Sequence, residues 1–129
     1  MKLRIRDNSV RLRLTRSEVE TLRSDGMVSS RTAFPGGREF QYVLESSPAN
    51  VSPGVSLSDF VMTVRLPETS VLAWAATDQV SIEGEQLLND GEKTTILVEK
   101  DFVCLAPRAG EDESDMFPHP KSESDEATR

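Results

Sequence analysis

The chain has 129 residues, of which 36% are hydrophobic and 29% are charged, and its net charge is −7. This length predicts one domain that buries a core without disulfides or metal ions. The negative charge argues against indiscriminate binding to nucleic acid or anionic membrane. The single cysteine, Cys104, excludes an internal disulfide and suits a reducing compartment. We find no signal peptide and no membrane-spanning run, so we expect a cytoplasmic protein.

The charges are unevenly distributed along the chain. Residues 1–31 carry eight Lys or Arg residues against four acids, whereas residues 108–129 carry seven acids against three bases. The start of the chain is therefore cationic and its last stretch is acidic.

Two half-buried strands are predicted within residues 2–14. Apolar and basic residues alternate on both sides of the turn-forming residues Asp7, Asn8 and Ser9, which is typical of a hairpin with one polar face. The basic residues should therefore share the outer face of this hairpin.

A short helix follows the first hairpin. Thr15 and Glu18 have the spacing of a capping box, and Gly26 suits a left-handed cap at the helix end. A strand over residues 27–34 and a returning strand through residues 40–44 complete the first part of the chain.

The second part of the chain has the same order of elements. A connector rich in Ser, Pro, Asn and Gly covers residues 46–54. Alternating apolar residues from 60 to 66 predict a strand, and a short helix holding Trp74 comes next. Asn89, Asp90 and Gly91 form a hairpin turn, which leads to a last long strand over 94–105.

The two parts are similar when they are aligned with an offset of 52 residues. Apolar residues then coincide, as do the turns and the helix starts; Leu22 falls on Trp74, for example. After Gly37 and Gly91 the offset becomes 54. Periodicity alone is the alternative explanation of this agreement, and the coincidence of turns favours a true internal repeat.

We therefore predict an α+β, mostly β domain over residues 1–106, followed by a disordered acidic tail over 107–129. The domain is predicted to be a small pseudo-twofold β-barrel of two ββαββ repeats, 1–45 and 54–105, with two short helices. The predicted core includes Ile5, Leu12, Leu14, Val19, Leu22, Val64, Leu66, Trp74, Val80 and Ile96.

One segment resembles the strand–helix–strand unit of the cradle-loop barrels. The segment is Arg65-Leu66-Pro67-Glu68 together with Asp78-Gln79-Val80. The group includes the double-psi barrels and the swapped-hairpin DNA-binding domains of bacterial transition-state regulators and antitoxins. The group commonly has a Gly-Asp pair between the helix and the next strand; here Asp78 matches the Asp and Thr77 replaces the Gly. This resemblance implies a barrel, and in the swapped-hairpin members arginines around the barrel contact DNA.

The whole chain also resembles a family of short, acidic, uncharacterised bacterial proteins. The similar segments are KLRIRDNSVRLRLTRSEVETL (2–22), EKDFVCL (99–105) and GEDESDMFPHP (110–120). The resemblance implies no activity, because no biochemical role attaches to the family.

The basic residues of the first hairpin are the first candidate site. Arg forks suit phosphate oxygens, so this face predicts an anion- or nucleic-acid-binding surface. The alternative is a solvated sheet face, neutralised by the acidic tail. No aromatic residues are interleaved with the basic ones, which argues against single-strand binding. The candidates are Lys2, Arg4, Arg6, Arg11 and Arg13.

A different arrangement of the same charges would make an anion-binding tunnel. The arginines would then face inward together with metal-holding carboxylates such as Glu83, Glu85 and Glu99. That arrangement would place the alternating apolar residues of the hairpin outside, at the expense of the core.

Other candidates for chemistry are weaker. Cys104 lies on an apolar face, where core packing is the ordinary role of a thiol, and the single histidine, His119, lies in the predicted tail. The tail acids do not have the spacing of a calcium or zinc site. No nucleotide-binding loop or hydrolase motif occurs. We expect no cofactor and no metal.

Residues Met116-Phe117-Pro118 interrupt the acidic tail and could dock onto the domain or onto a partner. Our leading prediction is thus a non-enzymatic binding or accessory module for another protein. The first alternative is a DNA-binding regulator that uses the basic hairpin. The second is an anion-binding or phosphate-hydrolysing barrel.

Overall fold

The computed structural model describes residues 1–102 and 114–118. Cys104, His119 and most of the predicted tail lie outside the described residues, as do their predicted roles. The described chain is mostly β with two helices, as the sequence predicted. In chain order its elements are β1 (Lys2–Arg6), β2 (Ser9–Leu14), α1 (Arg16–Asp25), β3 (Met27–Phe34), β4 (Arg38–Ser47), β5 (Gly54–Ser58), β6 (Val61–Pro67), α2 (Glu68–Ala76), β7 (Ser81–Leu87) and β8 (Lys93–Lys100).

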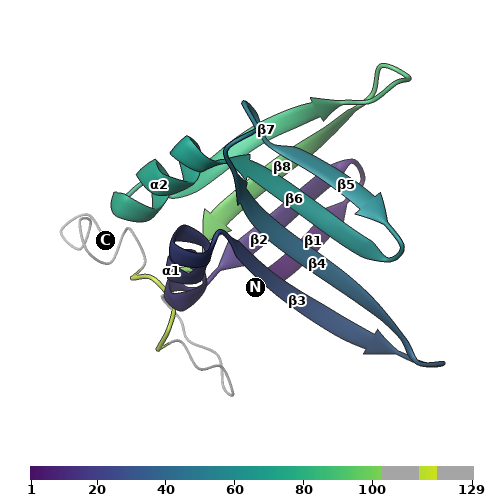
Figure 1. The fold of residues 1–129 in the computed structure, drawn as a ribbon, viewed down its shortest axis with the longest axis horizontal. Helices are drawn as coiled ribbons and strands as arrows, with labels where there is room; N and C mark the ends of the chain where they lie inside the picture. Colours follow the sequence, from purple (N-terminus) through teal and green to yellow (C-terminus); the bar gives the residue numbers. More distant parts are fainter. Residues whose placement is uncertain (103–113, 119–129) are drawn as a thin grey trace, which may run out of the picture.

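The strands form two four-stranded sheets (Figure 1). The strand order is β1-β2-β8-β7 in the first sheet and β3-β4-β6-β5 in the second. The central pairs, β2 with β8 and β4 with β6, are parallel, and the outer pairs are antiparallel hairpins. Each sheet therefore combines one hairpin from the first part of the chain with one from the second.

The two parts of the chain use the same strand registers. β1 pairs Lys2 with Arg13, and β5 pairs Gly54 with Arg65, each 52 residues further on. Both hairpin turns begin with an aspartate at positive φ, which is 49° at Asp7 and 51° at Asp59. Aspartate is one of the few residues that tolerates this conformation.

The change of offset from 52 to 54 lies earlier than the sequence predicted. β3 pairs Met27 with Glu45, and β7 pairs Ser81 with Glu99, so the offset is already 54 there. The reason is the exit from the helices. α1 ends at Asp25, and its cap Gly26, with a φ of 82°, turns the chain directly into β3, whereas residues 77–80 separate α2 from β7. We call residues related by these two offsets matched positions.

The helices lie side by side at one end of the sheets (Figure 1). The predicted capping box at the start of α1 is confirmed, because the Thr15 side chain and the Glu18 side chain each accept from the other residue's backbone N–H. α1 buries Val19 and Leu22. α2 begins after Pro67 without a side-chain cap and buries Val71 and Trp74.

The core lies between the two sheets and the helices, and Trp74 is its largest fully buried side chain. Two of the ten predicted core residues are wrong. Ile5 is 56% exposed, because it lies in the terminal strand β1. Val80 is 41% exposed, because it precedes β7 and Ile82 takes the buried place. The other eight are buried: Leu12, Leu14, Val19, Leu22, Val64, Leu66, Trp74 and Ile96.

The last predicted strand is present up to Lys100, where β8 ends, and residues 103–105 of that prediction lie outside the described residues. Neither helix in the described part of the chain has the length and hydropathy needed to cross a membrane.

Candidate anion-binding surface

The structure brings the five basic residues of the first hairpin together on one face. β1 and β2 pair Lys2 with Arg13 and Arg4 with Arg11, so these side chains form two neighbouring columns. The residues between them in β2 are buried in the core, which fixes the basic side chains on the outside. We call this surface the basic face: Lys2, Arg4, Arg6, Arg11 and Arg13.

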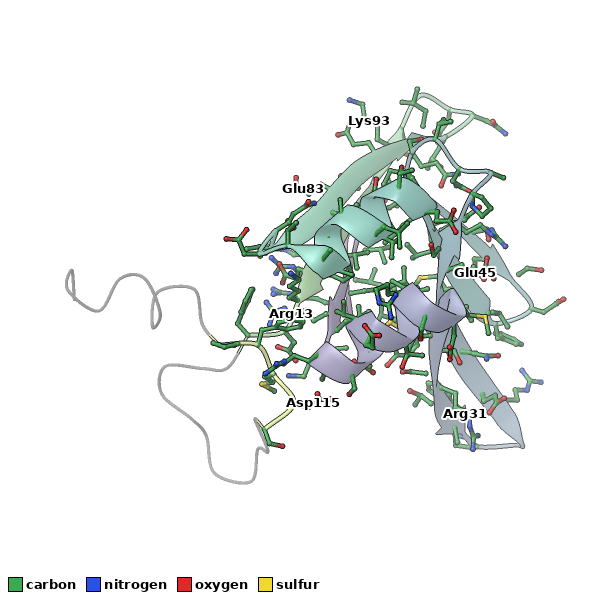
Figure 2. The ribbon with its side chains drawn as sticks, turned by 60° about the vertical axis from the view of Figure 1, so that its left-hand side comes forward. Arg13, Arg31, Glu45, Glu83, Lys93 and Asp115 are labelled. Carbon is green, nitrogen blue, oxygen red and sulfur yellow. The ribbon has the colours of Figure 1, made fainter. Side chains whose placement is uncertain are left out.

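The outward orientation bears directly on the tunnel hypothesis. That hypothesis required the arginines to face inward and Leu12 to face out, whereas Leu12 is buried. Figure 2 shows Arg13 and Glu83 toward one side of the molecule, with Arg31 and Glu45 toward the other. The geometry gives the basic face an open surface and not an enclosed channel.

Three of the five basic residues have acidic partners. The Arg13 Nε lies 2.8 Å from Glu99 Oε1, and the Arg11 Nε lies 3.3 Å from the same oxygen. This sharing follows from the register, because β2 and β8 pair Arg13 with Glu99. At the end of the face, the Lys2 Nζ lies 3.3 Å from Asp101 Oδ2.

Arg4 and Arg6 have neither an ion pair nor a hydrogen bond through their side chains to any of the residues in 1–102 and 114–118. Both are exposed. Two guanidinium groups on one strand, two residues apart, are therefore available to an external anion.

Two shallow hollows lie on the basic face, with volumes of about 340 and 310 Å³. Both are lined by Arg4 and Arg11. The half-buried Leu97 of β8 gives the larger hollow an apolar wall. The remaining lining residues are Arg6, Ser9, Val10 and Thr95 in the larger hollow, and Lys2, Leu3 and Arg13 in the smaller.

The opposite edge of the same sheet is acidic. β7 places Glu83 opposite Leu97 and Glu85 opposite Thr95, so both carboxylates lie on the outer face that the arginines share. Glu85 pairs with Lys93 at 3.6 Å. A long polyanion that crossed the sheet would meet these carboxylates, so the geometry favours a ligand confined to β1 and β2.

The matched hairpin, β5–β6, has a different composition. The matched positions of the basic face are Gly54, Ser56, Ser58, Thr63 and Arg65. Only the last is basic, and its Nε lies 2.9 Å from Glu45 Oε1, as Arg13 does from Glu99. This Arg–Glu pair thus belongs to the framework of both sheets. The other four basic residues occur in the first hairpin alone.

The structure places part of the predicted partner motif on the domain itself. The Phe117 N–H donates to the Asp101 carbonyl at 2.9 Å, and the Phe117 ring is half-buried against Phe102, with 5.7 Å between ring centroids. Met116 is half-buried and Pro118 is exposed. Phe117 therefore contacts the domain, while Pro118 remains exposed.

Asp115 holds the same segment to the start of α1. Its carbonyl accepts from the Arg16 N–H at 2.9 Å, and its carboxylate accepts from the Ser17 N–H at 3.2 Å and from the Ser17 hydroxyl. The hydroxyl bond lowers the pKa of the Asp115 carboxyl, with a further contribution from Thr15. The segment therefore caps a helix N-terminus with negative charge.

Asp101 connects this segment to the basic face, its neighbour Lys100 contacts the same segment, and sequence reasoning missed both. The Lys100 ammonium donates to the Thr77 carbonyl at 2.8 Å and lies 5.3 Å from the Phe117 ring centroid. Burial lowers the pKa of Lys100, while the Asp78 charge opposes that shift. Strand alternation was the available signal, because Lys100 continues the buried series of Ile96 and Val98.

Among residues 1–102 and 114–118, no group of three His, Cys, Asp or Glu side chains is arranged to hold a metal ion. The described surface offers guanidinium and ammonium groups, hydroxyls and an apolar wall. These groups bind anions by charge and hydrogen bonding.

The chain matches a family of unknown function, DUF7009, over residues 1–121, and it belongs to that family. No curated protein and no solved structure matches it. The family therefore assigns no activity to the basic face.

Proposed function

We propose that the protein is a non-enzymatic binding module whose basic face recognises an acidic segment of another protein. The observation that carries the proposal is the contrast between matched hairpins: four basic side chains occur in β1–β2 and are replaced by glycine, serine or threonine in β5–β6. Since both hairpins support the same kind of sheet, the framework does not require these four charges.

The pairing of the charges supports the same proposal. Arg13 is engaged by Glu99, as its matched residue Arg65 is by Glu45. Arg4 and Arg6 are exposed and have no partner within the described chain. Exposed cations that neither pair nor pack contribute little to stability, and their positive potential attracts an anionic ligand.

A protein segment fits the surroundings of the face better than a nucleic acid does. The net charge is −7 and Glu83 and Glu85 flank the face, so a duplex longer than the hairpin would be repelled. Ile5, which is 56% exposed on the other face of β1, would be covered by an apolar side chain of a peptide.

We treat residues 1–45 and 54–105 as halves of one pseudo-twofold, barrel-like domain, of which the first half carries the recognition surface.

The test compares two double variants with the same change of charge. R4S/R6S gives β1 the serines of the matched strand β5. The control R31S/R38S removes two exposed arginines from the second sheet. A fluorescent glutamate-rich peptide should bind the full chain, and R4S/R6S should weaken that binding about tenfold, since each lost contact to an exposed charge is worth up to about 1 kcal/mol.

The control should bind the peptide as the unchanged chain does, and binding to the unchanged chain should weaken as salt is added. Equal losses in both variants would mean that net charge alone attracts the peptide, and the proposal would fail. A short DNA duplex that binds more tightly than the peptide, with the same dependence on Arg4 and Arg6, would replace the protein partner by DNA.

A further inference from the structure

We infer that the partner segment binds as an added strand on the edge of β1, and that its acidic and apolar residues alternate. This inference rests on the proposed function and specifies the conformation and side-chain pattern of the ligand.

The first observation is that β1 is a terminal strand. The strand order β1-β2-β8-β7 leaves the outer edge of β1 without a strand partner in the described part of the chain. The backbone N–H and C=O groups along such an edge are a template for another extended chain.

The second observation is the contrast with the matched edge. β5 is also terminal, but its Val55 N–H donates to the Gln86 side chain of β7 at 2.6 Å, and Pro53 packs against Gly84. Val55 therefore points its N–H away from β6, and the matched residue Leu3 should point its N–H away from β2. No side chain of the described residues accepts from the Leu3 N–H. The edge of β5 is covered by β7, while no described residue pairs with the edge of β1.

The third observation concerns the side chains that border this edge. On the outer face, Lys2, Arg4 and Arg6 recur at every second residue. On the inner face, Leu3 is half-buried and Ile5 is 56% exposed despite its position in the core-facing series.

A strand added to β1 would place its own side chains alternately against these two rows. Acidic residues at every second position would meet the cations, and apolar residues between them would cover Ile5. The cations would also disfavour other strands, because a neutral or basic strand would leave the three charges unpaired.

The test uses the full chain and four synthetic peptides. The first alternates glutamate and valine; the second has the same composition with all glutamates in one block. The third and fourth are the alternating peptide with N-methyl groups on every second residue. One phase carries them on the glutamates and the other on the valines. The alternating peptide should bind about tenfold more tightly than the block peptide, and one N-methyl phase should abolish binding while the other retains it, because only one phase faces β1.

A residue-resolved readout locates the contact. The alternating peptide should slow amide hydrogen exchange at Leu3 and Ile5, whose N–H groups face outward, and leave Val55 unchanged. Equal affinity for the block peptide and both N-methyl phases would overturn strand addition. If R4S/R6S still weakened binding in that case, the proposed function would stand without it; if R4S/R6S also had no effect, both would fail.

Discussion

The two hairpins β1–β2 and β5–β6 differ in surface chemistry although they have the same place in their sheets. Both have the aspartate turn and the same register, and in both one arginine pairs with a glutamate on the neighbouring parallel strand. They differ in the remaining four outward positions and in the cover of their edges. The shared features are those that the fold requires. The four basic residues and the edge of β1, which no described residue covers, are not required by the fold.

The comparison predicts that matched core residues contribute similarly to stability. Trp74 and Leu22 are matched and fully buried. Trp74→Ala should cost about 3–5 kcal/mol and Leu22→Ala about 2–5 kcal/mol of unfolding free energy. Chemical denaturation measures both.

Leu72→Ala provides the control, because Leu72 is exposed on α2 beside buried Val71. Its cost should stay below about 1 kcal/mol. A large loss at Trp74 with almost none at Leu22 would contradict a core shared equally by the two halves.

The matched ion pairs should also behave alike, with a smaller effect. Arg13→Ala and Arg65→Ala each remove one partner of a half-exposed pair, so each should cost about 1 kcal/mol or less. Double-mutant cycles with Glu99 and Glu45 measure the coupling. A markedly larger coupling at Glu99 would show that this pair serves more than the framework.

The smallest effect is expected from the docked segment, through the contact of Asp115 with the start of α1. Folding lowers the pKa of Asp115 through the Ser17 hydroxyl. Its contribution to stability is therefore present above the unfolded pKa, about 3.9, and is lost as the pH falls through the lower folded value. Asp115→Asn should remove this part of the acid dependence of thermal unfolding.

The unchanged chain is the reference for that measurement, and Asp25→Asn is a suitable control, since Asp25 is an exposed acid at the other end of α1. The same acid dependence in Asp115→Asn and in the unchanged chain would exclude a stabilising role for the docked carboxylate.

Local patterns in the sequence predicted most of the fold. The capping box at Thr15 and Glu18 and the alternation in β2 depend on neighbouring residues, and the structure confirms both. The alternation also placed the basic residues on a single face. The strand order and the placement of Ile5 at an open edge depend on contacts distant in sequence, which no local pattern encodes.

The residues of the site that sequence reasoning missed also depend on contacts that are distant in sequence. Glu99 reaches two arginines because β2 and β8 are parallel neighbours, although 86 residues separate Arg13 from Glu99. Asp101 reaches Lys2 for a similar reason. Glu99 and Asp101 lie beside other basic residues, so Arg4 and Arg6 have no acidic partner among the described residues. This could be determined only from the tertiary structure.

The most direct test of the central claim moves the two available arginines to the matched strand. The variant R4S/R6S/S56R/S58R has the same composition and net charge as the unchanged chain, with the arginines on β5 instead of β1. Its affinity for the alternating glutamate–valine peptide, measured by fluorescence anisotropy, should be about tenfold weaker. An affinity equal to that of the unchanged chain would contradict the claim that the basic face of the first hairpin is the recognition surface.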